Sequence, residues 1–150
     1  MKKQTATSPT YPDAPRPAVG AVVFKDDAVL LVQRGNSPSR GMWAIPGGSV
    51  HLGETLRAAA EREILEETGV VIRAGDPILV FESIDKDDCG AVRFHYVIVD
   101  LTAEYVSGEP RAGDDAADAR WIREAELAWL PVNPATRRLL AEQFNFGKRA

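Results

Sequence analysis

The segment from residue 48 to residue 70, GSVHLGETLRAAAEREILEETGV, limits what this chain can fold into more than any other part of it. We expect a helix over residues 55–68, with Gly69 just past its end as a left-handed cap that turns the chain into the next strand. Three glutamates stand near the end of this helix, namely Glu63, Glu66 and Glu67. Side chains three and four residues apart share a helix face, so the sequence predicts a strongly acidic surface there.

This acidic surface is unfavourable for the helix itself. Glu63 and Glu67 are like charges at i,i+4, which costs roughly 0.2–0.5 kcal/mol, and the last turn already carries the negative end of the helix dipole. Departures from local rules concentrate at functional sites, so we expect a cation to offset the repulsion. Carboxylate oxygens favour Mg²⁺, Mn²⁺ or Ca²⁺ over zinc, and no cysteine or histidine lies at a useful spacing in the segment. A structural calcium site is disfavoured because the ligands ride on one helix without an EF-hand-like loop.

The alternative is a solvated helix face whose charges are balanced by ion pairs. Two pairs of opposite charge fit the i,i+4 spacing, namely Arg57 with Glu61 and Arg62 with Glu66. Glu63 and Glu67 have no such partner four residues away. Ion pairing therefore explains half of the charges and leaves the metal hypothesis for the other two.

The full spacing of this segment resembles the Nudix box. All nine positions that the motif specifies are filled, by Gly48, Glu54, Arg62, Glu63, Ile64, Glu66, Glu67, Gly69 and Val70. Nine matches on a loop, a helix and a turn are far more specific than a single glycine motif. The resemblance implies the α/β Nudix fold, a mixed β-sheet sandwiched between helices, over residues 18–146. Residues 1–17 carry four prolines and are expected to form a flexible lead-in.

By this resemblance, Glu63 and Glu67 would be the main ligands of Mg²⁺, with Mn²⁺ as the other candidate ion. Glu66 would be a further ligand or would position a water molecule. Glu54 would support the loop or a further metal, and Arg62 would pair with Glu66 and hold it in place. The expected catalytic residues are thus Glu54, Arg62, Glu66 and Glu67.

Residues outside the acidic helix are expected to complete the site. Glycine allows close approach of the backbone, so a carbonyl of Gly47 or Gly48 could face the metal, with Gly48 as the expected ligand and Gly47 as a substrate contact. Arg34 directly follows the second predicted strand and is a candidate for binding phosphate, although a solvated strand-end charge explains it equally well. Arg40 is a weaker candidate.

The general base is harder to assign from the sequence. Members of the family place it on a box glutamate or on an acidic residue in a later loop, and residues 108–115 form such a loop here. Asp114 and Asp115 are the candidates within it, against the alternative of a merely soluble loop. His51 and His95 occupy positions that the motif does not specify, and we expect both to be non-catalytic.

The chemistry that the resemblance implies is substitution at phosphorus. A Nudix hydrolase cleaves the diphosphate linkage in a nucleoside diphosphate joined to another group, and the metal neutralises phosphate oxygens and lowers the pKa of water. A nucleoside triphosphate pyrophosphohydrolase, which releases a monophosphate and pyrophosphate, is the alternative. A non-catalytic nucleotide-sensing Nudix domain is an alternative of another class, but such domains typically lose box glutamates, which are intact here.

The expected substrate is ADP-ribose or a nucleotide sugar. Residues 41–48 and 119–122 resemble small bacterial ADP-ribose pyrophosphatase-like proteins. The proline that marks many ADP-ribose enzymes beyond the box is missing from residues 84–88, which keeps the triphosphate alternative open. A base would need an aromatic ring on which to stack, and the strand aromatics Phe81, Phe94 and Tyr96 are candidates unless they belong to the core.

Composition agrees with one small domain of 150 residues. The net charge is −4 and the sequence has no run of basic residues, so we expect no binding to nucleic acid. The sequence also lacks the stretch of about 20 apolar residues that a membrane-spanning helix needs. The N-terminus lacks the apolar core of a secretory signal, and the single cysteine, Cys89, cannot form an internal disulfide. We therefore expect a cytoplasmic protein. Members of the family are commonly dimers, which leaves a homodimer open.

Strand patterns flank the acidic helix on both sides. We expect a hairpin of strands 18–24 and 28–33, a second pair 78–84 and 92–101 across the turn at Cys89, and a short strand 119–122. A last helix is expected to begin at the N-cap Asn133 with Pro134 in its first turn. The residues expected to be buried on the two helices are Leu56, Ala60 and Ile64 on the first and Leu140 and Phe144 on the last.

Overall fold

The structure is a computed structural model that describes residues 10–36 and 39–148. Most of the predicted lead-in, residues 1–9, lies outside the described residues. The elements follow one another as β1 (Arg16–Lys25), β2 (Ala28–Arg34), β3 (Trp43–Ala44), β4 (Gly47–Ser49), α1 (Leu56–Thr68), β5 (Val71–Lys86), β6 (Val92–Ser107), β7 (Ala116–Arg123), the 3₁₀ helix η1 (Glu124–Ala128) and α2 (Pro134–Phe144).

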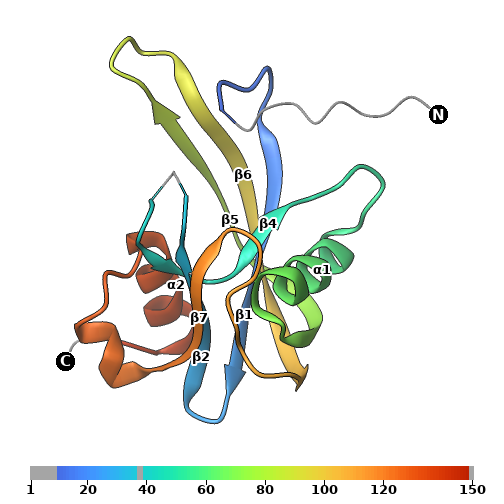
Figure 1. The fold of residues 1–150 in the computed structure, drawn as a ribbon, viewed down its shortest axis with the longest axis vertical. Coiled ribbons are helices and arrows are strands. Elements are labelled where there is room, and N and C mark those ends of the chain that lie inside the picture. Colours follow the sequence, from blue (N-terminus) through green and yellow to red (C-terminus); the bar gives the residue numbers. More distant parts are fainter. Residues whose placement is uncertain (1–9, 37–38, 149–150) are drawn as a thin grey trace.

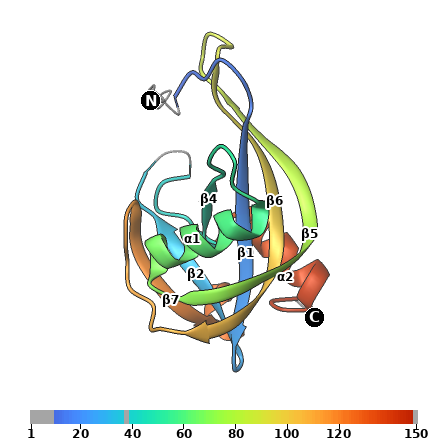
Figure 2. The same ribbon diagram turned by 90° about the vertical axis from the view of Figure 1, so that its right-hand side faces the viewer.

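The strands form one mixed sheet between two helices (Figures 1 and 2). The main order is β3-β2-β1-β6-β5, with β4 paired to β1 and β7 paired to β2. The pairing of β1 with β6 is parallel, whereas the other strand pairs are antiparallel. This arrangement confirms the predicted α/β fold.

The two faces of β1 pack against different helices, because alternate residues of a strand point to opposite sides of a sheet. On one face, Val19 and Ala21 belong to the cluster that contains Ile64 of α1. On the other face, Val22 belongs to the cluster that contains Leu140 of α2. The core therefore has two layers, one under each helix.

Helix α1 begins and ends as the sequence predicts. The hydroxyl of the N-cap Thr55 accepts a hydrogen bond from the N–H of Ala58, and Gly69 adopts the left-handed conformation with φ of 76°. Ala60 and Ile64 are fully buried, as expected. The prediction for Leu56 is wrong: this side chain is exposed, since it stands in the first turn, outside the cluster of buried residues.

Both predicted hairpins and the predicted last helix are present. Strands β5 and β6 are 16 residues each, longer than expected. Gly75 and Pro77 are residues that disfavour the interior of a strand. Register shifts between Ala74 and Leu79 nevertheless let β5 continue through this segment. The amide oxygen of Asn133 caps α2 by accepting from the N–H of Ala135.

The β5–β6 hairpin projects from the body of the molecule (Figure 1). The hydroxyl of Tyr11, from the segment before β1, donates to the carboxylate of Asp87 at the tip of this hairpin over 2.8 Å. Cys89 is exposed in the same tip. Strand β1 begins at Arg16, two residues before the expected start of the domain. Over the parts of the chain that the structure describes, no helix is long and apolar enough to cross a membrane.

Candidate functional site

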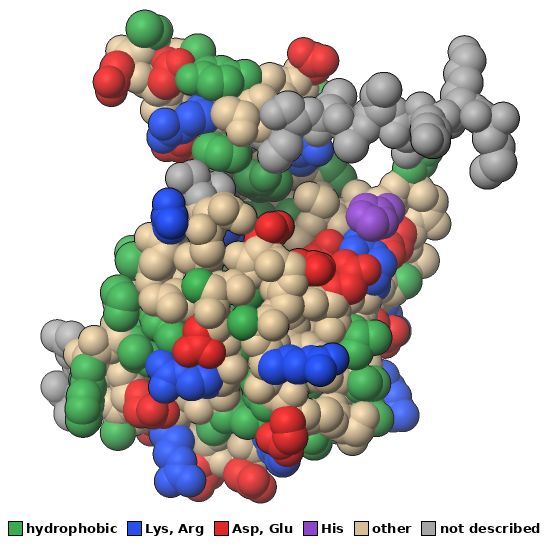
Figure 3. Space-filling model, in the orientation of Figure 1, with side chains coloured by type: hydrophobic (Ala, Val, Ile, Leu, Met, Phe, Trp, Pro, Cys, Tyr) green, Lys and Arg blue, Asp and Glu red, His purple; other side chains and the backbone are tan. Residues whose placement is uncertain are grey.

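One pocket brings together most of the residues that the sequence singles out. It lies where the end of α1 meets β4 and the ends of β2 and β6. The predicted site residues that line it are Arg34, Gly47, Gly48, Arg62, Glu63, Glu66, Glu67, Asp114 and Asp115. In the space-filling view, acidic side chains gather below the projecting hairpin, with a basic and a histidine side chain beside them (Figure 3).

Arg62 holds the acidic cluster together. Its guanidinium donates two hydrogen bonds to Glu54, of 2.7 and 2.9 Å, and further bonds to Glu63 at 2.7 Å and Glu66 at 3.1 Å. It also donates to the backbone carbonyl of Ser49 at 2.9 Å. The predicted pair of Arg62 with Glu66 is thus confirmed. One cation links the helix to the loop that precedes it.

Of the two ion pairs that fit the i,i+4 spacing, the pair of Arg57 with Glu61 is not formed. Arg57 does not pair with Glu61 but with Asp76 of β5, over 2.8 Å. Glu61 instead accepts a hydrogen bond from the backbone N–H of Ala74. Both partners lie on the strand beside the helix, which spacing along the helix alone cannot reveal. Glu63, which has no oppositely charged partner four residues away, pairs with its neighbour Arg62.

Glu54 does not line the pocket; it supports the loop through Arg62. Both of its carboxylate oxygens accept from the guanidinium, and one also accepts from the backbone N–H of His51. These bonds lower the pKa of Glu54 to about 2. The contacts agree with the predicted support of the loop.

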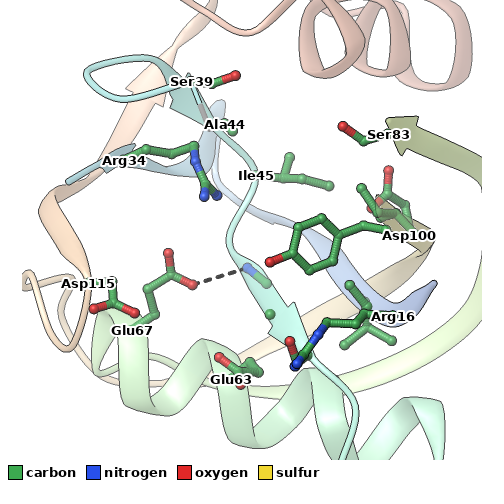
Figure 4. A pocket seen from close by; sticks show the side chains of 18 of the residues that line it. Arg16, Arg34, Ser39, Ala44, Ile45, Glu63, Glu67, Ser83, Asp100 and Asp115 are labelled. Atoms are coloured by element: carbon green, nitrogen blue, oxygen red, sulfur yellow. Dashed lines mark hydrogen bonds between the residues drawn. The ribbon is translucent and has the colours of Figure 1, made fainter. Parts of the chain in front are cut away.

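Glu67 lies at the centre of the polar half of the pocket (Figure 4). Burial raises the pKa of its carboxyl to about 7, although the backbone N–H of Gly47 donates to it over 3.2 Å. Nearby Arg34 lowers this pKa, whereas Glu63 and Asp115 raise it. The pKa of Glu63 is also raised by burial, against the opposing effect of Arg62. Burial thus outweighs the favourable contacts of Glu63 and Glu67, the two carboxyls that were expected to be the main metal ligands.

The glycines of β4 allow the strand to approach α1. A Cβ atom at Gly48 would collide with the carboxylate of Glu63, and one at Gly47 would collide with the backbone carbonyl of Val19. Neither glycine has a positive φ, so the requirement is space and not an unusual backbone conformation. Backbone polar atoms of β4 consequently lie directly beside the acidic side chains.

The donor set suits a hard divalent cation, but it is not gathered into a finished site. Within residues 10–36 and 39–148, no three acidic, histidine or cysteine side chains lie close enough to hold an ion. The guanidinium of Arg62 donates hydrogen bonds to the carboxylates of Glu63 and Glu66, and the backbone N–H of Gly47 donates to that of Glu67. The available donors are carboxylate and backbone oxygens, which match Mg²⁺ or Mn²⁺.

Several residues that line the pocket are not predicted from the sequence, above all Asp100 and Ser83. Asp100 carries a detectable signal, since it is the one charged residue in the apolar run 97–101 of β6. Phe81, Phe94 and Tyr96 also line the pocket, as their candidacy for stacking requires. Of the two histidines, His51 lines it whereas His95 does not.

The chain matches one protein family over most of its length. The family profile described as NUDIX domain matches residues 14–143. The chain therefore belongs to the Nudix hydrolase family. It is similar to the ADP-ribose pyrophosphatase of Methanocaldococcus jannaschii, with 38% identity over 108 residues. That match covers 72% of this chain but only 62% of the other protein, so the chain spans less than two thirds of that relative's length.

Two further matches cover a larger share of the similar protein. The putative 8-oxo-dGTP diphosphatase 2 of Mycobacterium tuberculosis is 34% identical over 132 residues, which cover 83% of this chain and 84% of that protein. The crystal structure of a MutT Nudix hydrolase from Burkholderia pseudomallei superposes with a TM-score of 0.72 at 34% identity, over 85% of this chain and 97% of the other. These similarities confirm the Nudix fold.

The raised pKa of Glu67 predicts how the metal-free protein responds to pH. Between the ordinary pKa of about 4.5 and the folded value of about 7, the folded protein keeps a proton that the unfolded chain has released. This group therefore lowers stability as pH rises through that range. We expect Glu67→Gln to raise the melting temperature in EDTA clearly at pH 8 and little at pH 5. An equal rise in melting temperature at pH 5 and pH 8 would show that the raised pKa of Glu67 is not the cause of the lower stability.

Proposed function

We propose that the protein hydrolyses the diphosphate linkage of a nucleoside diphosphate joined to another group, with ADP-ribose or a nucleotide sugar as the substrate class. The observation that supports this most is the division of the pocket into two halves. One half carries Glu63 and Glu67 of α1, and the other carries Phe94 and Tyr96 of β6. A nucleoside diphosphate has the matching division, since its charged phosphates are joined to a flat base.

In this proposal, Glu63, Glu67 and the carbonyl of Gly48 would hold Mg²⁺ or Mn²⁺, with Glu66 as a further ligand. When bound, the ion would neutralise the diphosphate oxygens and lower the pKa of water. Holding an ion there requires a deprotonated Glu67, so an ion that binds to the metal-free protein near neutral pH would displace the proton that the raised pKa of Glu67 retains.

The other polar residues of the pocket would bind and orient the substrate. Arg34 approaches the same space as Glu67 from the end of β2 (Figure 4) and would bind a phosphate oxygen. Asp115 lies close enough to raise the pKa of Glu67 and, with Asp114, remains the candidate for accepting the proton of the attacking water. Arg62 would keep Glu63 and Glu66 in position without touching the reacting atoms.

The alternative substrate class is a nucleoside triphosphate, which the similarity to a putative 8-oxo-dGTP diphosphatase favours. A panel separates the two: ADP-ribose, nucleotide sugars, dinucleoside polyphosphates and nucleoside triphosphates, each with Mg²⁺ or Mn²⁺ and with EDTA. We expect nucleoside monophosphate as a product from the diphosphate compounds, and no turnover in EDTA. Turnover of triphosphates alone, with release of pyrophosphate, would support the alternative.

The sensing alternative predicts a different outcome of the same panel. A non-catalytic domain would bind a nucleotide tightly in Mg²⁺ and form no product. The complete set Glu63, Glu66 and Glu67 argues for catalysis, since a domain that only binds has no need of an acidic cluster that its own helix resists. Tight binding without turnover would reverse this conclusion.

A further inference from the structure

The loop between β6 and β7, residues 108–115, runs back along the end of α1. The last four carbonyl groups of an α-helix have no partner within the helix. The backbone N–H of Arg111 donates to the carbonyl of Thr68 over 2.8 Å, and that of Gly113 donates to the carbonyl of Glu67 over 2.9 Å. The loop therefore binds the same end of α1 that presents the carboxylate of Glu67 to the pocket.

The contact between this loop and α1 leaves no space for a side chain at Gly113. A Cβ atom at Gly113 would collide with the backbone carbonyl oxygen of Glu66. Gly113 has no positive φ, so alanine would suit its backbone conformation and fail only for lack of space. The carbonyl of Glu66 belongs to the helix backbone and cannot rotate away, so a side chain at Gly113 would displace the loop. Glycine thus sets how closely the loop lies against the helix.

The turn that follows Gly113 carries Asp114 and Asp115. The carbonyl of Gly113 accepts a hydrogen bond from the N–H of Ala116 over 3.1 Å, which closes the turn. Asp114 adopts a left-handed conformation within it, with φ of 45°. Because the turn is short and closed, a displacement of Gly113 moves Asp115 as well.

The end of β2 holds the other side of the same turn. The backbone N–H of Gly35 donates to the carbonyl of Asp115 over 3.1 Å, and a Cβ atom at Gly35 would come within 2.5 Å of that oxygen. Gly35 directly follows Arg34 in the chain. Figure 4 shows Asp115 beside Glu67, with Arg34 approaching the same space from β2. The turn is therefore fixed between the end of α1 and the end of β2.

We propose that Gly113 is a positioning residue that fixes the distance between Glu67 and Asp115, and that Gly35 likewise fixes Arg34 relative to Asp115. The inference rests on the proposed function for the roles of these three side chains. Each glycine acts by letting two backbone segments touch, and the side chains that those segments carry do the chemistry. A displacement of about 1 Å in such a group can cost about 10²-fold in rate.

The kinetic test compares Gly113→Ala and Gly35→Ala with the wild type, on the compound that the panel identifies as substrate and with saturating Mg²⁺. We expect Gly113→Ala to lower kcat about tenfold or more and to leave KM within about twofold, because the phosphate contact of Arg34 stays in place. Gly35→Ala should also raise KM, by about tenfold, because it displaces the charge-assisted contact of Arg34. Ala112→Ser, an exposed neighbour of Gly113, is the matched control and should stay within about twofold in both constants.

A double-mutant cycle shows whether Gly113 acts through Asp115. Asp115→Asn should lower kcat, and the addition of Gly113→Ala to it should lower kcat by no more than about twofold further. Multiplication of the two single effects, wild-type kcat in Asp115→Asn, or wild-type kcat in a folded Gly113→Ala protein would each overturn the inference. Melting temperatures show which variants are folded, and Gly35→Ala carries the test where Gly113→Ala does not fold.

Amide hydrogen exchange tests the docking of the loop without a substrate. We expect the N–H groups of Arg111 and Gly35 to be protected in the wild type and to exchange about tenfold faster in Gly113→Ala, with no change at Ala60 in the middle of α1. Unprotected amides in the wild type, or equal protection in the variant, would overturn the inference. A wild type that turns over no compound of the panel would overturn the proposed function, whereas the exchange rates decide separately whether the loop is docked as described.

Discussion

Replacing Glu67 with glutamine is expected to lower kcat for the preferred substrate by about 10²–10³-fold with the fold retained. Glu67 has the strongest burial effect among the box glutamates and accepts a hydrogen bond from the strand that faces α1. Glutamine keeps the size of the side chain and removes the charge that would hold a cation. The measurements are kcat with saturating Mg²⁺ and metal affinity by calorimetry.

Glu61→Gln is the matched control for this variant. Glu61 lies on the same helix but outside the pocket, where it accepts from the backbone N–H of Ala74. We expect its kcat to stay within about twofold of the wild type, because no group in the pocket changes. Wild-type turnover by a well-folded Glu67→Gln protein would remove Glu67 from the proposed set of metal ligands.

Arg62→Met is expected to lower both stability and activity. The side chains of Arg62, Glu54 and Glu63 are only 21%, 15% and 17% exposed, so the variant leaves sheltered carboxylates without a cation. We expect a loss of about 2 kcal/mol in the free energy of unfolding at pH 7 and a fall in kcat of about tenfold or more. Thermal and urea unfolding, together with kcat, measure the two effects.

The pH dependence of this loss follows from Glu54. Its folded pKa of about 2 lies below the ordinary value of about 4.5, so its contribution is fully present above pH 4.5 and is lost as pH falls toward 2. The stability difference between wild type and Arg62→Met should therefore shrink below pH 4.5. A difference that stays constant down to pH 2.5 would exclude Glu54 as its main source.

Arg57→Met on the same helix provides the comparison. The guanidinium of Arg57 lies 2.8 Å from the carboxylate of Asp76, but the two side chains are 59% and 85% exposed. Water screens such a pair, so we expect a change of no more than about 0.5 kcal/mol. Equal losses from both arginine variants would show that burial does not set the strength of these pairs.

Local features of the fold could be predicted from the sequence because they depend on neighbours in the chain. The start of α1 at Thr55, its left-handed cap at Gly69 and the N-cap of α2 at Asn133 depend on contacts within a few residues. The turn between β1 and β2 is equally local. The exposure of Leu56 and the extension of β5 through register shifts depend on packing against distant strands, which spacing along the chain does not contain.

The candidate site divides in the same way. The box glutamates and glycines could be found because the motif fixes their spacing. Arg34 could be found because it follows a predicted strand, and Asp115 because it lies in an acidic loop after the box, where the family can place a base. Asp100 and Ser83 could not be placed, since their position in the pocket depends on how β6 pairs with β1 and β5. That pairing joins residues far apart in the chain.

The parallel pairing of β1 with β6 also bears on how the chain reaches its native state. Arg16 stands opposite Tyr96, and the register continues to Phe24 opposite Glu104. Each of these contacts closes a loop of about eighty residues, which costs entropy before any contact forms and slows folding. During synthesis on the ribosome, β1 must wait for β6 to emerge. Its unpaired edge is meanwhile open to wrong partners, which makes this strand the expected starting point for misfolding in destabilised variants.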